Sequence, residues 1–250
     1  MGGIEPDAQR PAGPALTDVL FADRLELSFH PVAEPIREPR AKLGGQPCWL
    51  ETPTWPLSAS SHMPMCFVGQ FPIPGSGGRV AYLFLTEGPD EVTALTSEPD
   101  GGENALLVQP GGRIPDFLAV SEQPAGPSLW RRGAHWDDHV PVELQINVAE
   151  LDPAQEQALD AEIAAQEAEI AGIDLEIPEI DILSPRGYVG GKPCFWQPHI
   201  VLAPPWRFFF QLDGAEGWED EQYALNLGGG TGYAYLSADG LEGRFYWDRV

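Results

Sequence analysis

The chain carries one short pattern twice: two glycines, any residue, a proline, a cysteine and then an aromatic residue. The first copy occupies residues 44–49 and ends in Trp49, and the second occupies residues 190–195 and ends in Phe195. The two glycines permit a positive φ or a close backbone approach, and the residue before the proline is held extended. Each copy is therefore predicted to be a turn that leads into a β-strand.

Two further segments follow each copy in the same order. The segment "CFVGQF", which holds Gln70, is matched by "FFFQLD", which holds Gln211. The segment "GGRVAYLFLT" is then matched by "GGTGYAYLS", so that Tyr82 aligns with Tyr233. The spacing between matched segments drifts along the chain, as insertions in surface loops would produce at little cost in closure entropy. Three motifs in one order indicate an internal duplication.

A duplicated β unit has a clear consequence for the fold. The 28 glycines and 26 prolines are scattered between apolar segments, which is typical of turns in a β-rich protein. Each half supplies a sheet with open edges and an apolar face that needs the other half to bury it. We therefore expect a mainly β, internally duplicated, pseudo-two-fold antiparallel unit with one acidic amphipathic helix between the repeats.

The same patterns divide the chain into segments. Residues 1–22 are rich in Pro, Ala and Gly and are predicted to be a flexible N-terminal segment. Residues 23–250 are predicted to form a single duplicated domain, with repeat one at about 38–150 and repeat two at about 182–250. The acidic helix, residues 152–172, separates the two repeats.

This helix has signals at both ends. Asp152 is a favourable N-cap, Gln155 completes a capping box with it, and Gly172 marks the C-terminal end. Acidic side chains cover much of the helix, and it contains no Lys or Arg to pair with them. The acidic surface is either a solvated helix face or a docking surface for a basic partner.

The clearest strand pattern lies shortly before the helix. Between residues 140 and 148, apolar side chains alternate with polar ones, which predicts one strand with a single apolar face. The apolar residues are Val140, Val142, Leu144, Ile146 and Val148. The earlier segment "RVAYLFLTEG" is apolar enough to be a strand that is buried on both faces.

The charge balance restricts the class of partner. The chain has 14 Lys and Arg against 38 Asp and Glu, which gives a net charge of −24. Such a surface repels phosphate backbones and anionic lipids, so binding to nucleic acid or to a membrane is disfavoured. The charge either maintains solubility or attracts a basic protein partner.

The three cysteines and the termini indicate a cellular compartment. An odd number of widely spaced cysteines predicts neither a disulfide framework nor a zinc site. No signal peptide is visible at the N-terminus, and no segment approaches the ~18 apolar residues of a membrane span. A reduced, cytoplasmic protein without a cofactor is expected.

At these motifs the sequence resembles the bacterial YwqG-like family, a domain of unassigned function. Its members carry Lys-x-Gly-Gly-x-Pro, then "FLxQID"-like strands, and then Trp, acidic and Gly-Gly positions before an aromatic strand. The corresponding residues here are 42–47, 67–71, 208–213, 218–220 and 228–235. The resemblance extends over roughly residues 38–250.

The family is related to the eukaryotic programmed-cell-death-protein-2 group. The resemblance implies an all-β duplicated fold and a protein-binding, chaperone-like role. The chain departs from the family pattern at two places. Many relatives have a Cys pair before the first Gln strand, where this chain has Cys66 alone, and the second Gly-Gly copy follows Tyr188 and Val189 instead of a Lys.

Two copies of one unit would form a central groove lined by matching segments. The candidate binding residues of this groove are Trp49, Gln70, Trp196, Gln211 and Trp218. Gln70 and Gln211 lie in the middle of apolar segments, where a buried amide requires partners. They either hydrogen-bond a neighbouring loop or the other repeat, or they recognise a peptide backbone in the groove.

The segment "HWDDH" has the composition of a metal site. His135, Asp137 and His139 are suitable ligands if the segment is helical. However, Gly133 precedes the segment and a strand follows it, which favours a polar turn.

Cys48 and Cys194 are candidate nucleophiles with His62 or His199 as a base. Both cysteines begin apolar aromatic strands at equivalent positions of the repeat, which instead favours a role in packing.

These observations favour a non-enzymatic protein-binding or chaperone-like module for a basic or extended polypeptide. One alternative is a hydrolase that uses Cys or a His/Asp metal site. Another is an acidic, immunity-type inhibitor of a partner enzyme.

Overall fold

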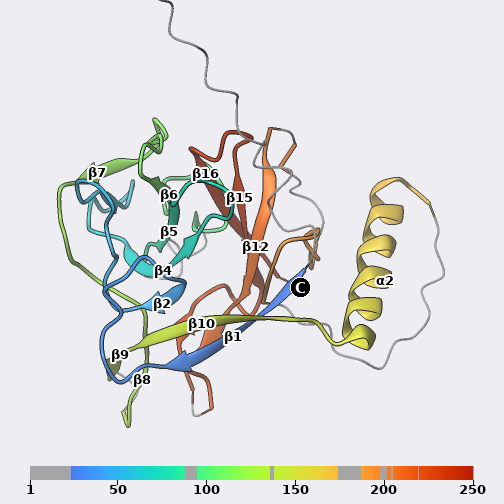
Figure 1. Ribbon diagram of the computed structural model, residues 1–250, viewed down its shortest axis with the longest axis horizontal. Coiled ribbons are helices and arrows are strands. Elements are labelled where there is room, and N and C mark those ends of the chain that lie inside the picture. The colour runs from blue at the N-terminus through green and yellow to red at the C-terminus, as the bar shows by residue number, and fades with distance from the viewer. Residues whose placement is uncertain are drawn as a thin grey trace, which may run out of the picture.

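The computed structural model describes residues 24–87, 95–135, 138–173, 187–197, 202–203, 205–218 and 220–249. The N-terminal segment expected at residues 1–22 lies outside these ranges. Within them the protein is mainly β, with sixteen strands and one whole α-helix (Figure 1). The mainly β class that the sequence predicts is therefore confirmed.

The largest sheet has ten strands, and every neighbouring pair in it is antiparallel. Its order is β16-β15-β12-β11-β1-β10-β2-β4-β5-β6. These strands are β1 Leu25–Pro31, β2 Lys42–Gly44, β4 Cys66–Pro72, β5 Val80–Leu85, β6 Asn104–Gln109, β10 Glu143–Glu150, β11 Tyr188–Val189, β12 Arg207–Asp213, β15 Thr231–Leu236 and β16 Gly243–Asp248.

Two smaller sheets lie outside the ten-stranded one. A four-stranded sheet has the order β13-β14-β8-β9, and a two-stranded sheet joins β3 to β7. Their strands are β3 Trp55–Leu57, β7 Ala119–Ser121, β8 Trp130–Arg132, β9 His139–Pro141, β13 Ala215–Glu216 and β14 Ala224–Leu225.

The ten strands of the large sheet fall into two series of five, one read from each end of the sheet. The sheet runs β6-β5-β4-β2-β10 from one end and β16-β15-β12-β11-β1 from the other, and the two series meet where β10 pairs with β1. The strand of the first Gly-Gly motif, β2, pairs with β10, whereas that of the second motif, β11, pairs with β1. Strands from distant parts of the sequence therefore lie side by side at the centre of the sheet.

Both Gly-Gly turns have the left-handed backbone that the sequence predicts, but the expected order of turn and strand is wrong. Each turn follows a short strand, β2 or β11, and neither Cys48 nor Cys194 lies in a strand. Gly44 and Gly45 have φ values of 66° and 64°, and Gly190 and Gly191 have values of 78° and 66°. Residues with a Cβ rarely adopt this left-handed region. A Cβ at Gly44 would also collide with the carbonyl of Val142.

The two matched glutamines hold these turns. The side-chain oxygen of Gln70 accepts the N–H of Cys48 at 2.9 Å, and that of Gln211 accepts the N–H of Cys194 at 3.0 Å. Both glutamines are fully buried. A buried amide that binds a loop backbone stabilises the loop, because loss of either partner would leave a polar group unsatisfied.

We call these two series of strands the two halves of the sheet. One apolar cluster, built from both halves, fills the space that the large sheet encloses. The rings of Phe71 from β4 and Phe210 from β12 stack with centroids 3.9 Å apart. The same cluster includes Leu83 from β5 and Leu236 from β15. Side chains from both halves therefore bury this face together.

The outer face of each half is covered by its own Gly-Gly-x-Pro-Cys segment. Trp49 stacks on Tyr82 with ring centroids 5.1 Å apart. Phe195 packs on Tyr233, also at 5.1 Å. The aromatic residue that closes each motif therefore shields the outer surface of its own sheet half.

The two ends of the large sheet approach each other, so that it is nearly closed (Figure 1). After β6, the N–H of Arg113 donates to the carbonyl of Leu241, just before β16, at 2.7 Å. Gly243 lies so near Leu106 of β6 that a Cβ would collide with its carbonyl. This contact protects two sheet edges from solvent.

The helix α2 Pro153–Ile170 forms as expected and stands to one side of the sheet (Figure 1). The Asp152 carboxylate accepts a first-turn N–H, and Gln155 reaches back to the N–H of Asp152, which completes the capping box. Leu159 and Ile163 are buried against the sheet, whereas Ile170 is exposed. No helix of the described ranges has both the length and the apolar composition to cross a membrane.

The prediction of one strand through residues 140–148 is wrong. The chain forms β9 and β10, which belong to different sheets, and Val142 between them donates its N–H to the carbonyl of Leu129. Leu144 and Ile146 are buried as expected, but Val148 is 52% exposed. Alternation of apolar residues identifies a face but not a change of sheet.

Replacement of either buried glutamine by leucine should destabilise the protein. We expect Gln70→Leu and Gln211→Leu each to lower the free energy of unfolding by about 1–3 kcal/mol, because a buried N–H loses its acceptor. Urea unfolding followed by far-UV circular dichroism measures this loss. The exposed helix residue Gln157 is the control, and Gln157→Leu should change stability by no more than about 0.5 kcal/mol. Equal effects at all three positions would contradict the role of the two amides.

Candidate functional site

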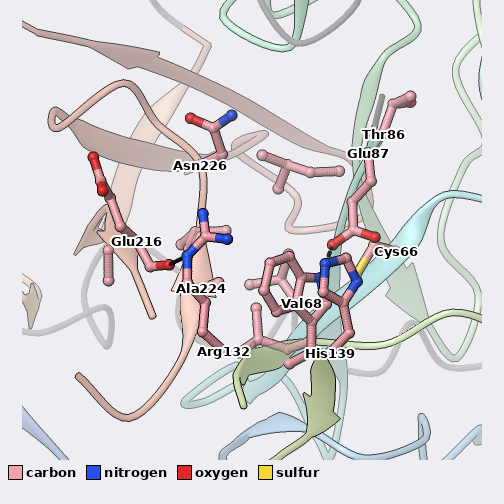
Figure 2. A pocket seen from close by; sticks show the side chains of 14 residues that line it. Cys66, Val68, Thr86, Glu87, Arg132, His139, Glu216, Ala224 and Asn226 are labelled. Carbon is pink, nitrogen blue, oxygen red and sulfur yellow. Dashed lines mark hydrogen bonds between the residues drawn. The ribbon is translucent and has the colours of Figure 1, made fainter. Parts of the chain in front are cut away.

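A cavity of about 450 Å³ opens between the large sheet and the four-stranded sheet (Figure 2). Both parts of the chain form it, since β8 and β9 come before α2 in sequence, whereas β13 and β14 come after it. It is lined by Cys66, Val68, Leu85, Thr86, Glu87, Leu129, Trp130, Arg132, His139, Ala215, Glu216, Ala224, Leu225 and Asn226.

The floor of the cavity is aliphatic. Val68 from β4, Leu85 from β5 and Leu225 from β14 are buried, and Leu129 lies just before β8. These side chains also belong to the cluster inside the large sheet. The floor is therefore an open part of the core, and an apolar group placed there would be removed from water.

A carboxylate stands on one wall of the cavity. The indole N–H of Trp130 donates to Glu87 at 2.6 Å (Figure 2). His139 stacks on Trp130 with ring centroids 3.6 Å apart and the planes 8° from parallel. Among the residues that the structure describes, Glu87 forms no ion pair. The wall therefore holds a carboxylate that a hydrogen bond positions and that has no ion-pair partner within the described part of the chain.

The thiol of Cys66 lies beside this carboxylate. Burial raises the pKa of Cys66 well above its ordinary value, and the charge and hydrogen bonding of Glu87 raise it further. The thiol is therefore protonated at neutral pH. Nucleophilic catalysis requires the thiolate, so this environment is opposite to that of a catalytic cysteine.

Arg132, two residues after Trp130 on β8, also lines the cavity and joins β8 to the β13–β14 segment. Its Nε–H donates to the carbonyl of Glu216 at 3.0 Å, and its main-chain N–H donates to that of Gly217 at 3.1 Å. Its guanidinium lies 4.3 Å from the ring centroid of Trp218. Figure 2 shows Arg132 and Glu216 together, across the cavity from Glu87. Arg132 thus fixes the separation of the walls.

Two exposed apolar side chains lie on or next to the strands of the four-stranded sheet that covers the cavity. Trp218 is 41% exposed and Val140 is 37% exposed. Glu216 and Glu221 accept hydrogen bonds from the indole and main-chain N–H groups of Trp218 at 2.8 and 2.9 Å. Aromatic and acidic groups are thus combined on this sheet, and exposed aromatic groups are common in binding surfaces.

Of the five groove candidates from the sequence, Trp218 contacts two residues that line this cavity, Arg132 and Glu216. Gln70 and Gln211 hold their own turns and are not exposed to any groove. Trp49 packs on the outer face of the sheet, and the indole N–H of Trp196 donates to a threonine hydroxyl at 3.0 Å. Matching positions of the two halves therefore support the fold, whereas the cavity lies elsewhere.

Of the "HWDDH" segment, the structure describes residues 135, 138 and 139. The Asp138 carboxylate accepts the N–H of His135 at 3.1 Å, and Asp137 lies outside the described residues. No group of three or more His, Cys, Asp or Glu in the described ranges is arranged to hold a metal ion. His139, which was proposed as a metal ligand, instead lines the cavity.

The other two cysteines lie apart from this cavity. Cys194 is buried under α2, with its sulfur 3.6 Å from the amide nitrogen of Gln166. Cys48 is half-buried, and its thiol donates to the carbonyl of Ile36 at 3.3 Å. His199, one of the proposed bases, lies outside the described residues. These contacts are typical of cysteines that serve in packing.

Sequence patterns did not indicate Glu87, Trp130 or Arg132. The available signal for Glu87 is its position two residues after the end of a strand that is buried along its whole length. Trp130 and Arg132 lie in a short strand with half-buried residues, which has no distinctive pattern. Comparison with protein-family models, with curated proteins and with solved structures found no match. The cavity itself is therefore the basis for assigning a function.

Labelling of the thiols should follow their burial. A thiol-reactive dye should modify Cys48 first, and Cys66 should react slowly in a variant that retains only this cysteine. Glu87 raises the pKa of Cys66, so Glu87→Gln should lower that pKa, increase the thiolate fraction and accelerate labelling between about pH 7 and pH 9. Rapid labelling of Cys66 in the presence of Glu87 would contradict this account.

Proposed function

We propose that the protein is a non-enzymatic, protein-binding or chaperone-like module that holds a side chain of an extended, basic polypeptide in this cavity. The observation that carries the proposal is the Glu87 carboxylate, which is positioned by Trp130 above an aliphatic floor and has no counter-ion in the described residues. A long cationic side chain matches both features, because its stem is apolar and its head is charged.

The charge of the whole protein supports the same class of partner. A net charge of −24 attracts basic polypeptides and steers their approach. Glu216 and Glu221 add negative charge beside Trp218, and Asp138 lies just before β9. An extended chain could contact these side chains while one of its residues occupies the cavity.

The alternatives from the sequence receive less support. The proposed nucleophiles of a hydrolase, Cys48 and Cys194, both lie outside the lining of the cavity, and the described residues hold no group arranged as a metal site. An acidic inhibitor of a partner enzyme would use the surface charge but would give the cavity no role. A binding module uses both features, and we therefore favour it.

We also propose that the chain is a cytoplasmic member of the YwqG-like family that arose by tandem duplication. The two copies would then be residues 25–109 and 143–248, each of which gives its first strand to the other. Support comes from the matched turns and from the register, in which Leu25 pairs with Glu150 and Leu144 pairs with Pro31. These boundaries place β10 at the start of the second copy and not at the end of the first.

Neutralising the cavity carboxylate should weaken binding of a basic polypeptide. We expect Glu87→Gln to raise the Kd for an unfolded, lysine-rich polypeptide about tenfold in a fluorescence titration. The control is Glu156→Gln, which makes the same change of charge at an exposed position of α2. The affinity of the unsubstituted protein should fall as salt is added, because exposed charges are screened. Equal effects of the two substitutions, or binding that is insensitive to salt, would contradict the proposal.

A further inference from the structure

The aromatic rings that line the cavity are already engaged with each other. They belong to Trp130 and His139, which lie face to face with centroids 3.6 Å apart. A planar guanidinium gains much of its advantage over an ammonium by stacking on an aromatic face. The face of Trp130 that His139 covers cannot offer this contact to a ligand.

A guanidinium is also already present at the cavity. Arg132 lies 4.3 Å from the ring centroid of Trp218 and 5.8 Å from that of Trp130. Trp218 is not among the residues that line the cavity. The protein thus uses its own arginine for the stacking contacts that an incoming arginine would seek.

The remaining features of the cavity match a compact cation on a flexible aliphatic stem. The floor of Val68, Leu85 and Leu225 is suited to methylene groups, and Glu87 supplies one carboxylate whose Oε1 is already bound to the indole of Trp130. A carboxylate with one oxygen engaged is poorly suited to the two parallel hydrogen bonds that arginine forms. It can still attract the point charge of an ammonium group.

We infer that the cavity selects a lysine side chain over an arginine side chain, with the stem on the aliphatic floor and the ammonium group at Glu87. This inference rests on the proposed function, because it names the residue of the bound polypeptide that the cavity takes.

The test uses peptides of one extended, alanine-flanked sequence that differ only at a central position. That position is lysine, arginine, Nε-acetyl-lysine or norleucine, and binding to the full chain is measured by fluorescence anisotropy. We expect the lysine peptide to bind about tenfold more tightly than the arginine peptide. Acetyl-lysine and norleucine should bind weakly, since the first lacks the charge and the second lacks the head group.

Two variants relate the preference to the cavity. Glu87→Gln should remove the preference for lysine over norleucine, whereas Glu156→Gln should keep it. Arginine binding as tightly as lysine, or norleucine binding as tightly as lysine, would overturn the inference. So would a preference for lysine that Glu87→Gln leaves unchanged.

The same titrations separate this inference from the proposed function. If no peptide binds while the unfolded, lysine-rich polypeptide does, the lysine site is wrong and the binding module stands. If the arginine peptide binds more tightly and Glu87→Gln weakens it, the cavity binds basic chains but its selectivity is opposite. If neither peptides nor polypeptide bind, both proposals are wrong.

Discussion

The contact between Phe71 and Phe210 joins the two inner faces of the protein. Phe71 lies on β4 and Phe210 on β12, and each of these strands pairs only with strands of its own half of the sheet. The centroids of the two rings are nevertheless 3.9 Å apart. Burial of apolar surface is the dominant favourable term in folding, and here that surface is shared between the halves. The central pairing of β1 with β10 and the near closure of β6 on β16 bring the strands around this common core together.

The candidate site depends on the same arrangement. The floor of the cavity consists of buried residues of the shared cluster, and its walls come from β8–β9 on one side and from β13–β14 on the other. Arg132 connects these walls through hydrogen bonds to Glu216 and Gly217. A charged wall above an aliphatic floor is therefore maintained only while both halves remain packed. This would link the stability of the core to the proposed binding of a cationic side chain.

The sequence predicted the parts of this structure that depend on local chemistry. The Gly-Gly turns, the buried strand β5 and the capped helix follow from backbone preferences and apolar patterns within a few residues. The change of sheet at Val142 could not be read from alternation, because both strands continue the same pattern. The cavity was missed for a related reason: comparison of the repeats selects matched residues such as Gln70, whereas much of the cavity is lined by segments that differ between the halves.

Native-state hydrogen exchange tests most directly whether the two halves form one cooperative body. Amides of β5 and β15, the matched strands of the two halves, are the informative probes. The shared core predicts that their slowest amides exchange with the same opening free energy and the same dependence on denaturant, because both require global unfolding. Exchange of one strand through a smaller opening, while the other stays protected, would contradict it. In that case one half would be stable without the other.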